Sequence, residues 1–375
     1  MPRILFGVTV PITAQVFLRD QLTALAQQDW DVHLATSPTE GFEDLTDVPG
    51  VTLHALPMKR PPAPLTDAVS LLRWISLLRR VKPDVIVAST PKAGLLGMLA
   101  ARFTRTPIRV YHLRGLRAEG LQGLPARLSW ASERLAISCA TSILCDSPSL
   151  LRKMRDLHLL SPRKGVVLGL GSCCGVDTDH FRPPSEAERH HARMTLGLDT
   201  DAVVVGFIGR IVSDKGIPEL LAALAGIHAD SPNLAIVLVG PEESGDVHIP
   251  QEAPWIHRVG SVEDVLPYLW SLDIFVLPSL REGFPISLLE AQACELPVIT
   301  TDATGCIDAV VDGVTGLVVP RRNVRALTEA LTDLVSHPDK REMMGRNGRT
   351  WVVDHFRSES VRSNVIGYFT ALAGA

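Results

Sequence analysis

The sequence is poor in aromatic residues and lacks any hydrophobic run long enough to cross a membrane. Trp, Tyr and Phe make up 5% of the 375 residues, whereas 46% of the residues are hydrophobic. A composition rich in aliphatic and poor in aromatic side chains is typical of buried parallel strands covered by helices. No stretch approaches the roughly 20 uninterrupted apolar residues of a membrane-spanning helix, which argues against such a helix in this sequence.

The cysteines and the N-terminal segment both indicate a cytoplasmic protein. The six cysteines form neither a CxxC pair nor a regular framework. Two of them, Cys173 and Cys174, are adjacent, which suits neither a common disulfide nor tetrahedral zinc, so we expect reduced thiols. The apolar N-terminal run resembles a signal peptide, but Pro11 interrupts it and Arg19 and Asp20 follow at once. It predicts a first strand that leads into a helix.

The net charge of −4 hides an asymmetry along the chain. Residues 1–164 carry 21 Lys and Arg against 13 Asp and Glu, whereas the remainder carries 16 against 28. Two segments of opposite charge predict two domains that meet different partners. The positive first half favours anionic surfaces or acceptors. The negative second half needs a few focused cations if it binds phosphate.

Short runs rich in β-branched residues alternate with helical segments along the chain, which is typical of βαβ units and parallel sheets. The predicted strands are 3–10, 31–36, 84–89, 108–113, 142–146 and 165–170 in the first half, and 202–209, 235–240, 256–259, 273–277, 297–301 and 316–319 in the second. Amphipathic helices fall between them, for example at 13–27 and 65–81. The stretch 169–199 breaks the rhythm and holds the interdomain connection. The sequence therefore predicts an α/β protein with two successive doubly wound domains, 1–172 and 173–357.

The segment REGFPISLLE carries two glutamates, Glu282 and Glu290, with seven residues between them. It follows the predicted strand 273–277, and Pro285 is expected at the first helical position. A helix that begins there directs its unpaired N–H groups and positive dipole end at a ligand, which suits a diphosphate. Gly283 lets the backbone come close to that ligand, with Glu282 placed for sugar hydroxyls and Glu290 for a ribose. A bare pair of acids could simply favour the first helical turns, but the Gly-Phe-Pro and the preceding strand favour a site.

The segment FIGRIVSDKG places Arg210 and Lys215 on the loop between the strand 202–209 and a helix that starts near Pro218. The planar guanidinium and the compact ammonium suit the two charged phosphates of a nucleotide diphosphate. Taken alone, the pair could be two surface cations on a turn. Together with the glutamates at an equivalent strand end of the same domain, it predicts a focused positive site in the acidic half.

Three motifs in this order and spacing, GRIVSDKG, LPSLREGFPISLLEA and VVDGVTGLVVP, resemble the retaining glycosyltransferases of family 4, which have the GT-B fold. The match covers nearly the whole chain and is most specific over 209–320. In the first half, STPKAGLLGMLAARF and VYHLRGLRAEG resemble the branch that builds capsular, O-antigen or exopolysaccharide repeat units on a lipid carrier. The resemblance implies two Rossmann-like domains that face a central cleft. It also implies that the last helix, 358–375, packs back on the first domain.

The resemblance further implies a role for each matching residue. Arg210 and Lys215 match the pair that binds the donor diphosphate and stabilises it as a leaving group. Glu282 matches the acid that contacts the transferred sugar, and Glu290 the acid that holds the ribose. The remaining donor contacts are expected from Gly283, Phe284, Pro285 and Ile286.

The implied reaction transfers a hexosyl or N-acetylhexosaminyl group and retains its anomeric configuration. An oxocarbenium-like sugar forms as the nucleotide leaves, and a phosphate oxygen takes the acceptor proton. Neither a metal nor another cofactor is expected, in agreement with the lack of a DxD-type motif. The base of the donor is expected to be uridine, with guanosine left open, and the acceptor a saccharide or a lipid-linked saccharide; no nucleic acid is expected.

The acceptor side departs from the family pattern in three places. Many relatives have a glycine pair in the first βα loop, where this sequence has VTVPITAQ. Many also carry a histidine just before the glycine of the fourth-strand loop. Here Arg114 takes that place and His112 precedes it by two residues, so either could face the sugar, or His112 could merely pack at its strand end. Asp308 stands where a glutamate is common. The residues expected on the acceptor side are Thr13, Ala14, His112, Arg114 and Arg117, with His112 also expected to take part in catalysis.

The sequence leaves two alternatives to a glycosyltransferase open. A nucleotide-sugar epimerase or hydrolase on the same fold would need extra acid or base groups facing the sugar, and a non-catalytic subunit would only bind the donor or a partner. A dehydrogenase is disfavoured because no GxGxxG follows the first strand.

The segment 59–82 combines apolar and basic residues at helical spacing. It is either a helix with a solvated basic side or a peripheral contact with anionic lipid at the inner face of the cell membrane.

Overall fold

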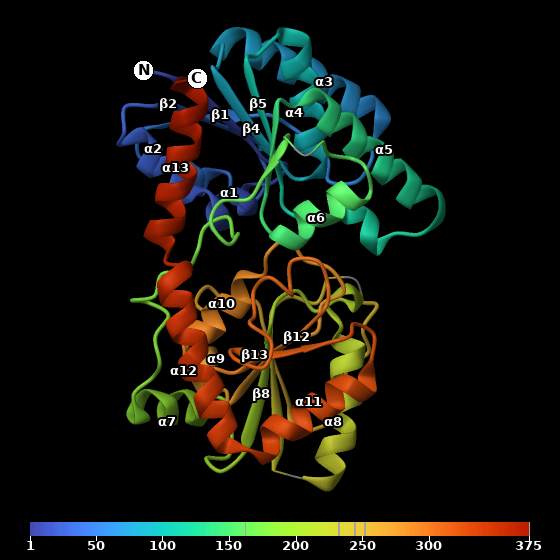
Figure 1. Cartoon of the computed structure of the whole chain (residues 1–375), viewed down its shortest axis with the longest axis vertical. Helices are drawn as coiled ribbons and strands as arrows, with labels where there is room; N and C mark the ends of the chain where they lie inside the picture. Colours follow the sequence, from blue (N-terminus) through green and yellow to red (C-terminus); the bar gives the residue numbers. More distant parts are fainter. Residues whose placement is uncertain (162, 232, 244, 251–252, 375) are drawn as a thin grey trace. The chain divides into compact units, whose positions relative to one another are not determined.

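The computed structural model describes residues 1–161, 163–231, 233–243, 245–250 and 253–374. It divides into two compact units (Figure 1), Met1–Cys174 together with Glu359–Ala375, and Gly175–Ser358. Each unit is built on one parallel sheet with helices on both faces. The α/β prediction with two doubly wound domains is therefore confirmed. Among the described residues, no helix combines the length and hydropathy needed to span a bilayer.

The sheet of the first unit has seven strands in the order β3-β2-β1-β4-β5-β6-β7. The strands are β1 (Arg3–Gly7), β2 (Asp31–Thr36), β3 (Val51–Ala55), β4 (Val85–Ser89), β5 (Ile108–Leu113), β6 (Ser142–Cys145) and β7 (Gly165–Val166). Successive side chains alternate between the two faces, so Leu5 enters one core while Ile4 and Phe6 enter the other. Both faces of this sheet are thus buried.

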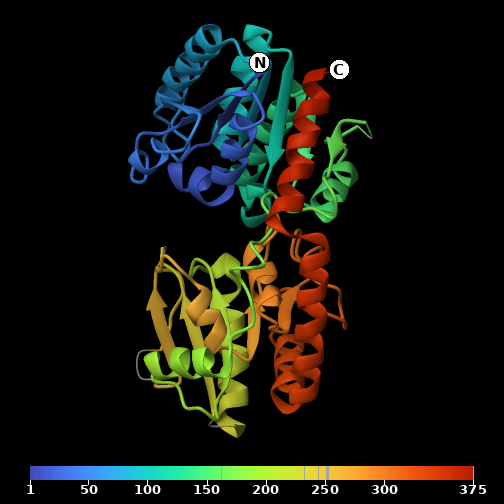
Figure 2. The ribbon, with the colours of Figure 1, turned by 90° about the vertical axis from the view of Figure 1, so that its left-hand side faces the viewer.

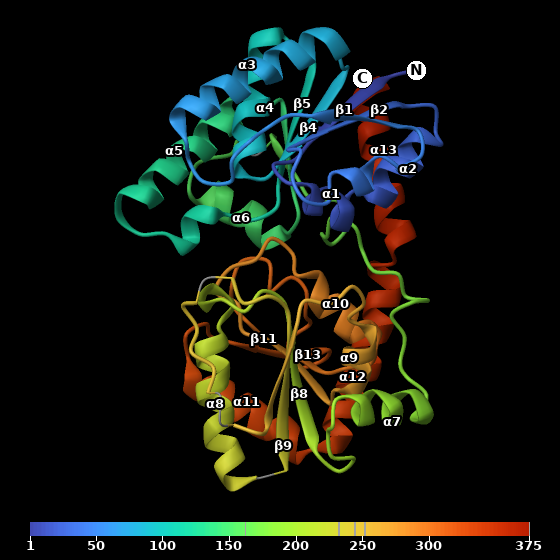
Figure 3. The same ribbon diagram turned by 180° about the vertical axis from the view of Figure 1, so that it is seen from behind.

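Different helices cover the two faces of the first sheet (Figure 3). One face packs against α3 (Pro64–Val81), α4 (Pro91–Thr104), α5 (Gly123–Cys139) and α6 (Pro148–Asp156). The other packs against α1 (Pro11–Phe17), α2 (Arg19–Ala26) and α13 (Ser358–Gly374). The C-terminal helix α13 lies along this sheet (Figure 2), with the Phe369 ring edge-on to Phe6 at 5.8 Å and the Tyr368 hydroxyl 2.7 Å from that of Ser142.

The second unit has a six-stranded parallel sheet in the order β10-β9-β8-β11-β12-β13. Its strands are β8 (Val203–Ile208), β9 (Leu234–Val239), β10 (Ile256–Gly260), β11 (Ile274–Leu277), β12 (Val298–Thr301) and β13 (Gly316–Val319). Its helices are α7 (Glu186–Thr195), α8 (Ile217–Asp230), α9 (Leu266–Ser271), α10 (Ile286–Ala293), α11 (Val324–Ser336) and α12 (Pro338–His355). Strands β8 and β11 are neighbours, which places the segments that follow them side by side at the carboxyl edge.

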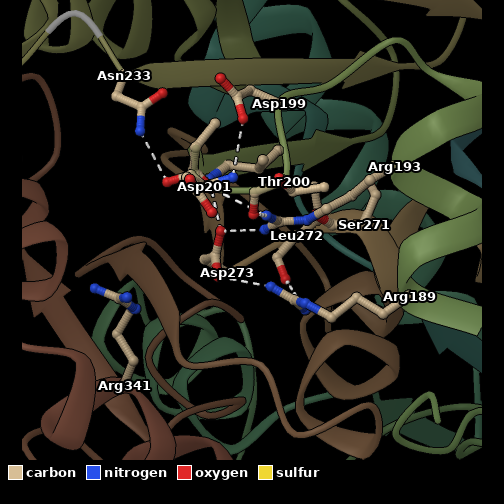
Figure 4. Close-up of polar contacts among 12 residues, drawn as sticks. Arg189, Arg193, Asp199, Thr200, Asp201, Asn233, Ser271, Leu272, Asp273 and Arg341 are labelled. Carbon is tan, nitrogen blue, oxygen red and sulfur yellow. Dashed lines mark hydrogen bonds and ion pairs between the residues drawn. The ribbon is translucent and has the colours of Figure 1, made fainter. Parts of the chain in front are cut away.

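At the opposite, amino edge of this sheet, the carboxylate of Asp273 joins three elements (Figure 4). Its Oδ2 accepts hydrogen bonds from the Val204 N–H at 2.7 Å and from Arg193 Nη2 at 2.6 Å, and its Oδ1 accepts from Arg189 Nη2 at 2.7 Å. The buried Arg193 also donates to the carbonyls of Thr200, Ala202 and Ser271. This network fixes α7 to the start of β8 and β11 with every charge paired.

The structure differs from the local predictions at several places. The helix expected at 13–27 is two helices, because Leu18 leaves helical geometry between α1 and α2. The strand expected at 165–170 ends at Val166, and the edge strand β3 was not predicted because its side chains are half-exposed. Pro285 is the residue before α10 rather than its first helical residue, as its ψ of 106° is extended.

Candidate functional site

The two loops at the carboxyl ends of β8 and β11 bring Lys215 and Glu282 into direct contact. The ammonium group of Lys215 donates to Glu282 Oε1, which also accepts from the Ser279 hydroxyl at 2.8 Å. Both charged side chains are mostly buried. Because the sequence separation is 67 residues, only the pairing of β8 with β11 creates this contact.

Glycine at position 216 allows the two loops to lie against each other. Gly216 has a φ of 74°, and a Cβ there would collide with the carbonyl oxygen of Pro278. The Leu280 N–H donates to the Asp214 carbonyl at 2.9 Å, and Arg281 Nη2 donates to the Asp214 carboxylate at 2.6 Å. The loops therefore form one surface rather than two independent turns.

Arg210 lies near the same cluster but bonds to a different acid. Its Nη1 donates to Glu243 Oε2 at 2.7 Å, and both side chains are partly exposed. Burial acts to lower the pKa of Arg210, but the bond to Glu243 and the nearby carboxylates of Asp214 and Glu282 raise it overall. The two predicted phosphate-binding cations thus lie around Glu282, each paired with a carboxylate.

The helix α10 begins beside this cluster without a side-chain cap. Pro285 precedes it and provides no capping side chain, and its first turn holds no acidic residue, so neither a cap nor a local carboxylate accepts from the N–H groups of the first turn. The Glu282 N–H donates to the Thr304 carbonyl at 2.9 Å. A Cβ at Gly305 would collide with the carbonyl oxygen of Gly283. Because glycine has no Cβ, the loop after β12 can lie in close contact with the backbone that precedes α10. Phe284 is buried against Phe356, with ring centroids 5.4 Å apart, and Ile286 packs at the core.

Glu290 lies one turn inside α10 and is half-buried. Burial raises its pKa to about 7, and the negative charge of Asp264 adds to the shift. A half-buried carboxylate of this kind can accept hydrogen bonds from hydroxyl groups once it is ionised.

In the first unit, His112, Arg114 and Asp146 form a buried charged cluster at the carboxyl ends of β5 and β6. His112 Nε2 lies 2.5 Å from Asp146 Oδ1, and Arg114 Nη2 lies 3.5 Å from His112 Nδ1. Since guanidinium only donates, His112 Nδ1 must be unprotonated and Nε2–H must donate to Asp146. Burial lowers the pKa of His112 despite the opposing charge of Asp146, which agrees with a neutral imidazole. The sequence left His112 and Arg114 as alternatives, whereas the structure puts both in one cluster.

The other residues expected on the acceptor side have different environments. Ala14 is fully buried in the core under α1, so its side chain cannot reach a ligand. Thr13 is half-buried in the first turn of α1, and Arg117 is exposed after β5. The Arg114 guanidinium lies 5.1 Å from the centre of the Phe17 ring, which links α1 to the buried cluster. Asp308 lies in the loop that follows β12.

Four further residues lie near these predicted sites and are not predicted from the sequence. Asp146, Glu243 and Asp264 contact or polarise predicted residues, but each is an ordinary acid in a loop and carries no sequence signal. Thr90, at the end of β4, has a φ of 70°, which is strained for a β-branched residue. The hydroxyl groups of Thr90 and Thr9 form a hydrogen bond with an oxygen–oxygen distance of 2.7 Å. Such strain at the carboxyl edge of a sheet is typical of ligand sites.

Comparisons with known proteins cover both units. Residues 188–351 match the family described as "Glycosyl transferases group 1", and residues 13–171 match the "Glycosyl transferase 4-like domain". The capsular polysaccharide biosynthesis glycosyltransferase CapM of Staphylococcus aureus is 36% identical over 352 residues, 92% of this chain and 90% of CapM. The N,N'-diacetylbacillosaminyl-diphospho-undecaprenol alpha-1,3-N-acetylgalactosaminyltransferase of Campylobacter jejuni is 28% identical over 72% of this chain and 73% of that protein.

Solved structures resemble the chain over its full length. Anabaena Alr3699/HepE in complex with UDP and glucose has a TM-score of 0.80 at 18% identity, and the match covers 99% of this chain and 100% of that chain. Sucrose-phosphate synthase of Thermosynechococcus elongatus has a TM-score of 0.82 at 20% identity, with 99% of each chain covered. At these identities the likeness shows the fold alone.

Proposed function

The chain belongs to the group 1 glycosyltransferases with the GT-B type of fold, and from this we propose that it transfers a sugar from a nucleotide-diphosphate sugar to a saccharide during polysaccharide assembly. The observation that carries the proposal is the cluster of Lys215, Arg210 and Glu282 beside the uncapped start of α10. Two cations and a helix N-terminus at one strand edge suit a diphosphate. CapM, the relative at 36% identity, supports a role in capsular polysaccharide synthesis.

In this proposal the donor replaces the internal partners of the two cations. Arg210 exchanges Glu243 for a phosphate oxygen, and Lys215 binds the diphosphate while staying near Glu282. Glu282 and the N–H groups of Gly283, Phe284 and Ile286 contact the transferred sugar and phosphate. Glu290 accepts hydrogen bonds from the ribose hydroxyls. All of these groups lie in the second unit, on the loops that follow β8, β9 and β11 or on α10.

The proposed chemistry depends on charge stabilisation. As the bond between sugar and diphosphate breaks, negative charge grows on the diphosphate, where Lys215, Arg210 and the α10 dipole oppose it. The sugar becomes oxocarbenium-like, the acceptor hydroxyl attacks the anomeric carbon, and its proton passes to the departing phosphate oxygen. We propose retention of configuration and no requirement for a metal.

The finer identity of the substrates is also a proposal. A similar glycosyltransferase of Escherichia coli is named for a UDP-Gal donor, which supports a uridine donor. Two similar glycosyltransferases are named for diphosphoundecaprenol-linked acceptors, one from Campylobacter jejuni and one from Escherichia coli, which supports a lipid-linked saccharide as acceptor. Together these names favour a reaction in which a sugar is added to a growing saccharide on a lipid diphosphate.

A thermal-shift panel of nucleotide sugars tests the proposal. The correct donor raises the melting temperature of the wild-type protein, and Lys215→Ala abolishes the shift at the same concentration. Product analysis with and without EDTA then measures transfer, metal dependence and anomeric configuration. Conversion of the donor without an acceptor would instead identify an epimerase or hydrolase, and donor binding without turnover would identify a non-catalytic subunit.

A further inference from the structure

The outer surface of the α3–α4–α5 layer has an unusual composition for an exposed helical face. Helix α4 lies between α3 and α5 (Figure 3), and all three bury their inner sides against the first sheet. Amphipathic helices in this position normally present polar residues outward. Here the outward sides of all three helices carry large apolar side chains.

Exposed apolar residues follow helical spacing on the two outer helices. On α3, Leu65, Val69 and Leu72 occupy positions i, i+4 and i+7, opposite the buried side that contains Trp74. On α5, Leu124, Leu128 and Leu135 occupy positions i, i+4 and i+11. The residue exposures are 86% for Leu65, 66% for Leu72, 68% for Leu124 and 62% for Leu128. Each helix therefore has a second apolar stripe in addition to its core side.

The middle helix continues the same pattern. Leu95 and Leu99 are partly buried on α4, and Phe103, one turn further, is 64% exposed. The Arg79 guanidinium of α3 lies 5.6 Å from the centre of the Phe103 ring, so a cation–π contact joins α3 to α4 at this surface. Two exposed apolar stripes, on α3 and α5, together with Phe103 on the helix between them, differ from the single scattered apolar residues of ordinary protein surfaces.

The charges on this layer have one sign. The exposed cations on or directly after these helices are Arg73, Arg79, Arg80, Lys82, Arg102, Arg105, Arg127 and Arg134. The three helices, all of whose residues are described, contain two acids. Asp67 is partly buried and accepts from Lys92 at 2.6 Å, and Glu133 is buried and accepts from the Tyr111 hydroxyl at 2.7 Å. No acid on these helices is exposed.

We propose that the outer surface of α3, α4 and α5 docks on an anionic lipid bilayer. The leucines and Phe103 would enter the boundary between headgroups and acyl chains, while the arginines and Lys82 extend to lipid phosphates. A second copy of the chain is a poor occupant, because two such faces would bring their cations together without a compensating acid. The inference does not depend on the donor chemistry, although a lipid-linked acceptor would lie in the same bilayer.

Vesicle co-sedimentation of the full chain tests this surface. The probes are vesicles of phosphatidylcholine alone and of phosphatidylcholine mixed with phosphatidylglycerol. Wild-type protein is expected to sediment with the anionic vesicles only. The double variant Leu72→Glu/Leu128→Glu, and separately Arg73→Glu/Arg127→Glu, should each reduce binding by at least about tenfold. Because every substituted side chain is exposed, the melting temperature should stay close to that of the wild type.

Matched controls come from the second unit. Met343→Glu replaces an exposed apolar residue there, and Arg322→Glu an exposed arginine, and both should leave vesicle binding unchanged. Equal binding to neutral vesicles, or anionic binding that survives both double variants, would overturn the proposal. So would a protein dimer in sedimentation velocity that the leucine substitutions dissociate. Thermal shifts by nucleotide sugars should be the same in all variants. A negative result for vesicle binding can therefore be distinguished from a negative result for donor binding.

Discussion

Lys215 and Glu282 form an ion pair across two loops that the sheet brings together, and Ser279 donates to the same Glu282 oxygen. The residue expected to bind the diphosphate is thus directly coupled to the residue expected to bind the sugar. Removing the charge of Lys215 or of Glu282 leaves the other side chain without its ion-pair partner. This coupling makes the pair the most informative target for mutation.

Lys215→Ala should reduce kcat/KM by about 10²- to 10³-fold, because it removes a cation from the charge that develops on the leaving group. Glu282→Gln should also reduce activity, and the double variant should lose less than the two single effects combined, since the residues act as a unit. Melting curves separate turnover from folding. Unchanged activity per folded molecule in Lys215→Ala would refute its role.

Glu243→Gln should tighten donor binding by about two- to fivefold, because the partly exposed pair with Arg210 is worth no more than about 1 kcal/mol. Arg210→Ala should weaken donor binding. In the Arg210→Ala background, Glu243→Gln should have no effect on the donor Kd measured by titration calorimetry. A Glu243 effect that persists without Arg210 would mean that the acid acts through another group.

Donor affinity should rise with pH through about 7, where Glu290 ionises. Burial raises the pKa of this carboxyl above its unfolded value, so the protonated folded form contributes stability in acid that is lost as the pH rises through 7. Ribose hydroxyls need the ionised form as acceptor, so binding should gain as folding stability falls. Glu290→Gln should flatten the pH profile of the donor Kd between pH 6 and 8; a wild-type profile that is already flat would contradict the assignment.

Asp146→Asn should destabilise the first unit by about 3–5 kcal/mol, because it leaves Arg114 without its counter-charge and gives His112 Nε2–H a neutral amide oxygen in place of a charged acceptor. Denaturant unfolding measures the loss. Asp156→Asn, an exposed acid of the same unit, should change stability by no more than about 0.5 kcal/mol. Equal effects of the two substitutions would show that the buried cluster has no special energetic role.

Asp273→Ala should also destabilise the protein by about 3–5 kcal/mol, since Arg189 and Arg193 lose their shared carboxylate (Figure 4). The network lies at the amino edge of its sheet, opposite the candidate donor loops, so activity per folded molecule should not change. Asp354→Ala, an exposed acid of the same unit, serves as the control. A loss of kcat that exceeds the loss of folded protein would connect this edge to the reaction.

Much of the fold follows from local sequence patterns. Strands β2, β5 and β13 have the predicted bounds, because short runs rich in β-branched and other apolar residues alternate with helical segments along the chain. The break at Leu18 and the edge strand β3 were not predictable in the same way. Their conformations depend on packing against the rest of the unit, and half-exposed strands lose the apolar signal.

Residue order alone predicts the two α/β domains, the family, and the candidate residues Arg210, Lys215, Glu282 and Glu290, since these stand in motifs of fixed spacing. What each of these side chains contacts depends on the folded chain. The bond between Lys215 and Glu282, the burial that raises the pKa of Glu290, and the joining of His112 to Asp146 all arise between segments distant in sequence. Electrostatic energies depend on distance and on exclusion of water, and both are set by how strands pair rather than by residue order.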